Sequence, residues 1–164
     1  MKYIVILALA LVPLQVRNAI AQVNVSETIV VKAHELTIEE RITIVLLDAG
    51  LDSMTAKLIV AQSKHESGNY KNSLTRKHNN VFARWWSKYD KYSMGSGAKA
   101  EGHTRFARYQ SIELATLSQI DYFKRKGYSM KWKSADAFAK ELKAKGYYAD
   151  STSNYSRALR RHLK

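Results

Sequence analysis

The feature that most constrains the fold is a change of pattern in the middle of the chain. Residues 37–66 and 111–163 place apolar side chains at helical spacing. From Asn69 to Tyr109 this spacing disappears, and aromatic residues, glycines and basic residues dominate. Gly95-Ser96-Gly97 within this stretch is typical of a hairpin turn. We therefore expect a mainly α domain of the α+β class, with a small β-hairpin or loop insertion after its second helix.

Capping signals predict where the helices begin. Thr37 and Glu40 have the spacing of a capping box. Asp52 or Ser53 is expected to cap a second helix, which ends near Glu66. Three further helices are expected in the second half of the chain, with starts near Ser111, Ser134 and Ser151.

The first 21 residues have the pattern of a secretory signal peptide. A basic start at Lys2 is followed by an uncharged run from Tyr3 to Leu14 and by the small-x-small site Ala19-Ile20-Ala21. The apolar run is shorter than the roughly 20 residues that span a bilayer. An uncleaved anchor or a buried first helix is the alternative. We expect a signal peptide (1–21), a linker (22–36) and a secreted or periplasmic domain (37–164), with no stable membrane span after cleavage.

The charge balance predicts an anionic partner. The chain has 27 Lys and Arg against 14 Asp and Glu, a formal net charge of +13. Nucleic acid, acidic lipid and acidic wall polymers all meet this requirement. Because an exported protein meets the cell envelope, we expect anionic cell-envelope polymers as partners and do not expect nucleic acid.

Several kinds of catalytic centre are excluded by the residues present. The chain has no cysteine, which excludes a cysteine nucleophile and cysteine-ligated metals. Its five histidines form no H-E-x-x-H motif, and no serine lies in a G-x-S-x-G setting. We expect no metal site and no cofactor.

Glu66 is the strongest candidate for acid catalysis. It lies on the same helical face as Gln62, Ile59 and Leu58. A carboxyl group at the end of a core-facing stripe is partly desolvated, which raises its pKa. A raised pKa suits a general acid near neutral pH. The alternative is an ordinary surface glutamate at a frayed helix end.

Motifs in a characteristic order follow this residue. They are Glu66-Ser67-Gly68, Asn79-Asn80-Val81-Phe82, Phe106-Ala107-Arg108-Tyr109, and Gly146-Tyr147-Tyr148-Ala149-Asp150 with Asn154-Tyr155. This order resembles the glucosaminidase family of peptidoglycan hydrolases, glycoside hydrolase family 73, whose helical core is similar to that of lysozymes. The resemblance covers roughly Thr37 to Leu163. It implies a lysozyme-like helical domain that cleaves a β-1,4-linked glycan.

The resemblance implies roles for individual residues. Glu66 matches the family's catalytic acid, and Tyr155 matches a tyrosine close to the active-site groove, so we expect both to be catalytic. Phe82 matches an aromatic residue that shapes the cleft. We expect Asn80, Phe82 and Tyr109 to contribute to substrate binding. Core packing is the alternative for Tyr109 and Tyr155.

The chain departs from the family pattern after Phe82. The family usually continues with Gly, whereas this chain has Ala83-Arg84-Trp85-Trp86. Glycine adopts backbone angles that alanine rarely does. The resemblance therefore does not predict the backbone path of the cleft wall at this point. We expect Trp85 and Trp86 to bind sugar faces, with filling of the core as the alternative.

Many glycosidases need a second carboxylate. In the family this group, where it is assigned, lies in the β insertion, and Asp90 and Glu101 are the candidates here. We favour Glu101 as the second catalytic residue because it is closer to Phe106. A solvated loop charge is the alternative for either acid. A single acid suffices if the 2-acetamido group of the substrate acts as the nucleophile.

These features predict an exported endo-β-N-acetylglucosaminidase that acts on the glycan strands of peptidoglycan. Glu66 would protonate the leaving oxygen on the reducing side of N-acetylglucosamine. A lytic transglycosylase, which shares the Glu-Ser pair, is the nearest alternative. A non-catalytic wall-binding or envelope-assembly protein that kept the cleft is a second alternative.

Overall fold

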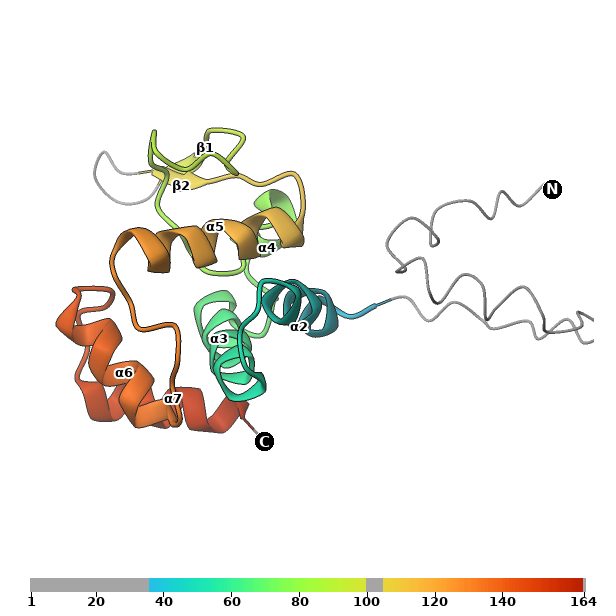
Figure 1. Cartoon of the computed structure of the whole chain (residues 1–164). Coiled ribbons are helices and arrows are strands. Elements are labelled where there is room, and N and C mark those ends of the chain that lie inside the picture. Colours follow the sequence, from blue (N-terminus) through green and yellow to red (C-terminus); the bar gives the residue numbers. More distant parts are fainter. Residues whose placement is uncertain (1–35, 100–104, 164) are drawn as a thin grey trace, which may run out of the picture. The chain divides into compact units, whose positions relative to one another are not determined.

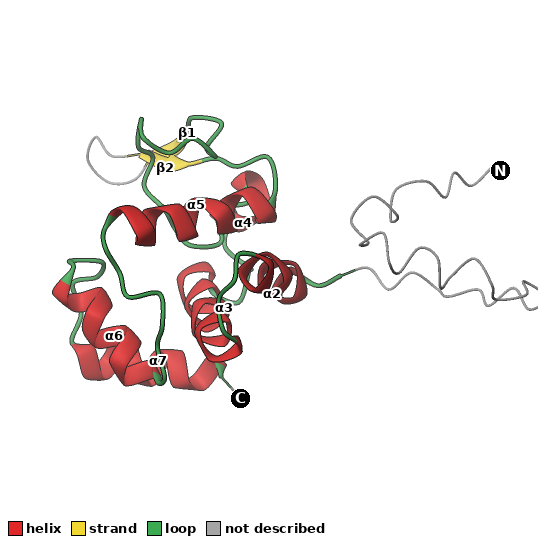
Figure 2. Cartoon of the chain, viewed as in Figure 1, coloured by secondary structure: helices red, strands yellow, loops and turns green. Residues whose placement is uncertain are grey.

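The computed structural model describes residues 36–99 and 105–163 (Figures 1 and 2). The elements are α2 (Ile38–Asp48), α3 (Ser53–Ser67), α4 (Ser73–His78), β1 (Ser96–Lys99), β2 (Arg105–Ala107), α5 (Ile112–Arg125), α6 (Ala135–Ala144) and α7 (Thr152–His162). The two strands form an antiparallel pair. The expected mainly α domain with a small β insertion is confirmed.

The short helix α4 is a correction to the sequence prediction. It lies within the segment that was expected to be irregular. Asn72 begins it by accepting a hydrogen bond from the backbone N–H of Thr75. Six residues are too few to show a helical stripe of apolar side chains, so periodicity alone could not find this helix.

The predicted signal peptide and residues 22–35 of the predicted linker lie outside the described residues. The division of the chain at residues 21 and 36 therefore stays a prediction. In the part of the chain that the structure describes, no helix is both long enough and apolar enough to cross a membrane.

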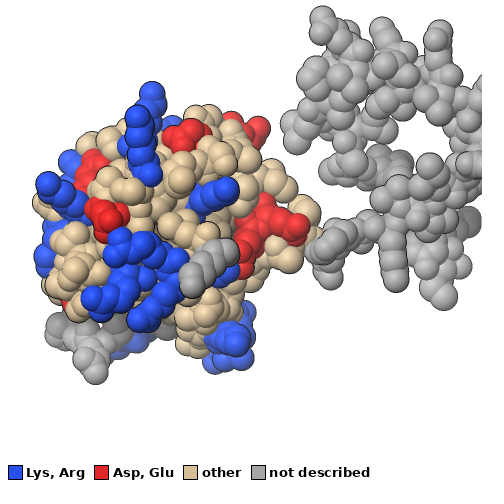
Figure 3. Space-filling model, turned by 90° about the horizontal axis from the view of Figure 1, so that it is seen from below, with Lys and Arg blue, Asp and Glu red and all other residues tan. Residues whose placement is uncertain are grey.

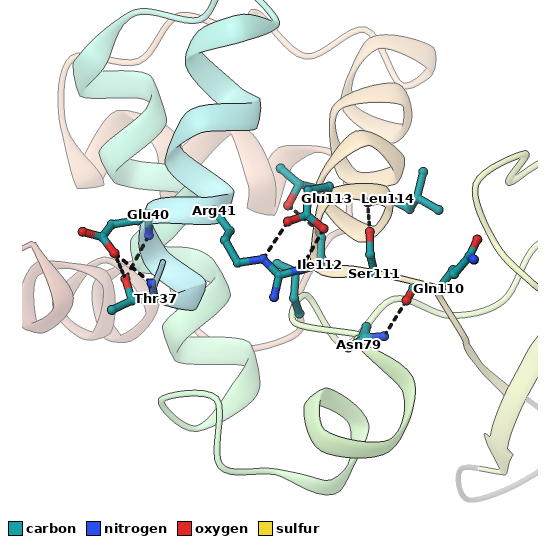
Figure 4. A network of polar contacts seen from close by, with 10 residues as sticks. Thr37, Glu40, Arg41, Asn79, Gln110, Ser111, Ile112, Glu113 and Leu114 are labelled. Carbon is teal, nitrogen blue, oxygen red and sulfur yellow. Dashed lines mark hydrogen bonds and ion pairs between the residues drawn. The ribbon is translucent and has the colours of Figure 1, made fainter. Parts of the chain in front are cut away.

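Each described helix begins at a side chain that accepts a backbone N–H from its first turn. The predicted caps are confirmed at Thr37, Ser111, Ser134 and Ser151. Asp52, rather than Ser53, caps α3. The Thr37–Glu40 capping box forms in both directions (Figure 4). Because the first N–H groups of a helix have no partner within it, these side chains fix where the helices start.

The hydrophobic core centres on α3. Nine of its fifteen residues are buried, and the helix packs against α2 and α7. Aromatic rings fill the space between α5 and α6, with Phe123 in contact with Trp132 and Phe138. Fully burying a side chain of this kind contributes about 1.5–3 kcal/mol. The helix that carries Glu66 in its last turn is therefore firmly fixed on several sides.

A bidentate ion pair joins α2 to α5 (Figure 4). Arg41 donates from Nε to Oε1 of Glu113 over 2.6 Å and from Nη2 to Oε2 over 2.9 Å. The guanidinium holds the pKa of Glu113 at about 2, below its ordinary value of 4.5. Glu113 also lies in the first turn of α5, where the helix dipole favours a negative charge.

Buried polar side chains attach the insertion to α5. The Asp90 carboxylate accepts hydrogen bonds from the hydroxyl of Tyr109 over 2.8 Å and from that of Ser118 over 2.7 Å. Trp85 forms an isolated antiparallel bridge with Phe106 of β2. These contacts fix the loop between α4 and β1 although it contains no regular structure of its own.

The turn after Phe82 keeps the geometry that glycine would favour. Ala83 has a φ of 47°, in the left-handed region. A side chain in this region costs roughly 1–2 kcal/mol. Ala83 is therefore a strained residue in the wall of the insertion.

Replacing Glu113 with Gln should remove a contribution to stability that depends on pH. Because the folded state lowers the pKa of Glu113, its ion pair stabilises the protein above pH 4.5 and is lost as the pH falls towards about 2. The pair is partly exposed, so its contribution is at most about 1 kcal/mol. The melting temperatures of the unchanged protein and of Glu113→Gln should therefore converge as the pH falls from 4.5 towards 2. A difference in melting temperature that stays constant with pH would contradict this account. Asp121→Asn, which breaks the ion pair with Arg125 within α5, is the control.

Ala83→Gly should raise stability by about 1 kcal/mol, because glycine adopts the left-handed conformation without strain. Ala137→Gly, at an exposed position inside α6, should lower stability by about the same amount. Thermal or urea unfolding of the two variants measures both changes. Destabilisation by both would show that Ala83 is not strained.

Candidate active site

Glu66 lies in the last turn of α3, two residues before the left-handed cap at Gly68. Its carboxylate is partly buried, and Oε1 accepts a hydrogen bond of 2.6 Å from the hydroxyl of Tyr155. Tyr155 is buried and belongs to α7, which packs against α3. The packing of these two helices therefore places the carboxyl group.

Opposing effects set the acidity of Glu66. Burial raises its pKa above the usual value, and this effect is the largest. The hydrogen bond from Tyr155 and the electrostatic interaction with His65 act in the other direction. Burial also raises the pKa of Tyr155 well above the ordinary value, so Tyr155 keeps its proton and acts as a donor. The net result is a carboxyl group that holds its proton to higher pH than a surface glutamate does.

Two aromatic contacts hold the Tyr155 ring in place. Tyr148 stacks on it with ring centroids 3.9 Å apart and an interplanar angle of 5°. The His65 ring lies nearly perpendicular to it, with ring centroids 5.1 Å apart. The hydroxyl of Tyr148 donates to the carbonyl of Ala139 in α6, which fixes the stack against the helices. The terminal motif therefore orients the group that bonds to Glu66.

Glu66 faces a cleft of about 350 Å³ between the helical core and the insertion. Five aromatic residues, two small residues and one cation form its other walls: Phe82, Ala83, Arg84, Trp85, Phe106, Tyr122, Gly146 and Tyr147. Five aromatic side chains in one wall, beside polar groups, are typical of a sugar-binding cleft, because sugar faces stack on rings. Such a cleft can hold a glycan with one of its bonds beside the carboxyl group.

The two adjacent tryptophans differ in their position. Trp85 lines the cleft, is 48% exposed, and stacks on Phe106 with centroids 4.5 Å apart. Trp86 is 44% exposed, does not line this cleft, and donates its backbone N–H to the carbonyl of Arg105. Neither ring fills the core. Trp85 offers a flat surface to a ligand in the cleft.

Asn80 is a candidate binding residue that bonds to the backbone of the insertion. Its Nδ2 donates to the carbonyls of Arg84 and Ala107, and its Oδ1 accepts the N–H of Arg84. The side chain is fully buried. Its polar atoms thus hold the wall of the cleft together and are already used within the protein.

Phe82 and Tyr109 are both buried. Phe82 lines the cleft, and its carbonyl accepts a hydrogen bond of 3.4 Å from the hydroxyl of Tyr147. Tyr109 bonds to Asp90 and Ser118 behind the wall and is not among the residues that line the cleft. Asp90, the other acid weighed from the sequence, is committed to the same buried network.

Glu101 lies outside the described residues. Among the residues that the structure describes, Glu66 is the one carboxylate that lines the cleft. The same part of the chain contains no group of three or more metal-ligating side chains. The described site can therefore donate a proton from one partly buried acid beside an aromatic surface.

Sequence reasoning did not single out Arg84, Tyr122 and Tyr147 as site residues. The guanidinium carbon of Arg84 lies 3.6 Å from the centre of the Tyr122 ring. Arg84 was visible only as part of a departure from the family pattern, and Tyr147 only as part of the terminal motif. Their meeting in one cleft depends on the fold, and no spacing along the chain signals it.

Comparison with families of known proteins gives one match. The glucosaminidase model, described as mannosyl-glycoprotein endo-beta-N-acetylglucosaminidase, matches residues 50–164. This span contains every described residue of the cleft. Comparison with curated protein sequences gives no match.

Three solved structures resemble the fold. One is a type VI secretion system effector–immunity complex from Pseudomonas protegens (16% identity, TM-score 0.52, 75% of this chain and 94% of that one). Another is a peptidoglycan hydrolase from Sphingomonas sp. A1 (22% identity, TM-score 0.53, 75% and 86%). The third is the catalytic domain of the autolysin Auto from Listeria monocytogenes (16% identity, TM-score 0.50, 91% and 90%). At these identities the likeness concerns the fold.

Tyr155→Phe removes the hydrogen bond to Glu66 and keeps the ring that packs on Tyr148. Because this bond stabilises the ionised carboxylate, its loss should raise the pKa of Glu66 further. Titration of the Glu66 side-chain carbon by NMR measures the shift. Tyr148→Phe, which removes a hydroxyl bonded to α6, is the control and should leave this pKa in place. A pKa of Glu66 that falls in Tyr155→Phe would contradict the assignment.

Proposed function

Because this chain belongs to the glucosaminidase family of glycoside hydrolases, we propose that it cleaves the β-1,4 glycan backbone of peptidoglycan. The bond cut lies on the reducing side of N-acetylglucosamine. The observation that carries the proposal is the partly buried Glu66 carboxyl group, with its raised pKa, in an aromatic cleft. Two of the proteins with this fold are themselves a peptidoglycan hydrolase and an autolysin, which supports the choice of substrate.

Glu66 acts as the general acid in this proposal. It gives its proton to the glycosidic oxygen while the bond between that oxygen and C1 breaks. Positive charge then develops on the sugar ring, as in other glycosidases. The raised pKa keeps the proton available at a pH where an exposed glutamate is ionised. Tyr155 aligns the carboxyl group through its hydrogen bond.

A second group completes the reaction by one of two routes. Glu101 removes a proton from a water molecule that attacks C1, which inverts the anomeric centre. Alternatively, the oxygen of the substrate's 2-acetamido group attacks C1, and water then opens the ring so formed, with retention. The stereochemistry of the first product distinguishes the two.

The proposed site of action is outside the cytoplasm. The signal-peptide pattern of residues 1–21 supports export. Exposed basic side chains on or next to α6 and α7 support attraction to anionic envelope polymers: Lys140, Lys143, Lys145, Arg157, Arg160 and Arg161. Figure 3 shows Lys and Arg gathering on the face seen from below. Such a surface raises the local concentration of the enzyme at the wall without selecting a bond.

A lytic transglycosylase is the second candidate. These enzymes act with one glutamate, and Glu66 is the one carboxylate that lines the described part of the cleft. The two functions differ in their products. Hydrolysis leaves a reducing N-acetylglucosamine end, whereas transglycosylation leaves an anhydro-muramic end.

Glu66→Gln should keep the fold and reduce the release of fragments from isolated peptidoglycan by at least about 100-fold, because a general acid contributes that much or more. Mass spectrometry of the released sugars measures turnover and identifies the new end. Glu39→Gln, an acid on α2 outside the cleft, is the matched control and should retain activity. Full activity of Glu66→Gln would end the proposal. Binding to the wall without product from any variant would point to a non-catalytic protein.

A further inference from the structure

Arg84 is a charged residue in the cleft whose guanidinium forms no hydrogen bond with the residues that the structure describes. Its Nε is buried and has no hydrogen-bond partner in the described part of the protein. None of the ion pairs among the described residues includes it. The residue as a whole is partly exposed and lines the cleft together with Glu66.

The guanidinium is held in a defined position. Its central carbon lies over the Tyr122 ring, 3.6 Å from the ring centre, an interaction that offsets part of the cost of desolvating a cation. The Arg84 backbone is fixed on both sides, because its N–H bonds to Asn80 and its carbonyl accepts from Asn80 and from the N–H of Ala107. Tyr122 covers one face of the guanidinium plane and forms no hydrogen bond with its edge.

An unpaired, partly buried cation is costly to the folded protein. The arrangement becomes favourable when a ligand brings an anion to the free edge. Arginine is suited to this task, because its planar fork matches the two oxygens of a carboxylate. Among the described residues that line the cleft, Arg84 is the one cation, and Glu66 is the one carboxylate that would compete with an anion there.

We propose that Arg84 forms a subsite for a carboxylate carried on the 3-O-lactyl substituent of the muramoyl sugar next to the scissile bond. This inference rests on the proposed function, since it names a feature of the same substrate. Trp85, the next residue, supplies the surface on which a sugar stacks. Arg84 then selects glycans with an acidic substituent over neutral glycans of the same linkage.

The carboxylate has two sources in peptidoglycan. In strands without peptides the lactyl group itself ends in a free carboxylate. In strands with stem peptides that group is an amide, and the free carboxylates belong to the peptide. Three substrates separate these sources: peptide-free strands, the same strands after reduction of the lactyl carboxylate to an alcohol, and strands with stem peptides.

The experiment compares the cleavage rates of these substrates by the full chain and by Arg84→Gln. The unchanged protein should cleave one carboxylate-bearing substrate at least about tenfold faster than the reduced strands, and Arg84→Gln should bring this ratio close to one. Arg108→Gln removes an exposed arginine from the same insertion and should keep the ratio. A higher rate on peptide-free strands assigns the lactyl group, and a higher rate on peptide-bearing strands assigns the stem.

Binding measurements separate a failure of this proposal from a failure of the proposed function. With Glu66→Gln as the background, the dissociation constants for carboxylated and reduced glycan are measured by calorimetry, with and without Arg84→Gln. This readout needs no turnover, so it tests the subsite even if no strand is cleaved.

Two results would overturn the subsite. One is equal rates and affinities for carboxylated and reduced strands in the unchanged protein. The other is that Arg84→Gln lowers the melting temperature but leaves the ratio of rates and the ratio of affinities between carboxylated and reduced strands unchanged. The guanidinium would then have a role in the fold alone. Partial retention of the ratio by Arg84→Lys would support the subsite, because a lysine keeps the charge and loses the fork.

Discussion

The site depends on one hydrogen bond between distant parts of the chain. Glu66 and Tyr155 are 89 residues apart, and their side chains meet because α7 packs on α3. The same packing removes the carboxyl group from water, which raises its pKa, while the tyrosine hydroxyl limits the rise. The packing of α7 on α3 therefore sets the acidity of Glu66. A change that loosens α7 alters the chemistry of Glu66 before it alters the cleft.

The insertion follows a different principle from the helical core. Its described part has two short strands, and side chains that bond to the backbone or to each other hold the rest of it in place. Asn80 closes one side of its wall, and Asp90 anchors the other to α5. Both side chains are thus committed to structure. Arg84 differs from them, because its backbone is fixed while its guanidinium contacts an aromatic ring and forms no hydrogen bond with the described residues.

Local signals in the sequence predicted the parts of the fold that depend on local physics. Helix starts at Thr37 and Ser111 follow from side chains that cap their own first turn. The position of Glu66 on a core-facing stripe follows from helical spacing. The role of Asn80 could not be predicted, because residue type does not reveal whether its donors are already bonded. The contact between Arg84 and Tyr122 joins the insertion to α5 and has no signature along the chain.

The placement of the tryptophans has a spectroscopic consequence. The chain has three, and they lie in contrasting surroundings: Trp85 and Trp86 are exposed on the insertion, whereas Trp132 is buried against Phe123 and Phe138. Indole emission depends on contact with water, so the two environments emit at different wavelengths. A sugar stacked on Trp85 changes the red-shifted part of the emission, and unfolding changes the blue-shifted part. The protein therefore carries separate intrinsic fluorescent reporters for occupancy of the cleft and for integrity of the core.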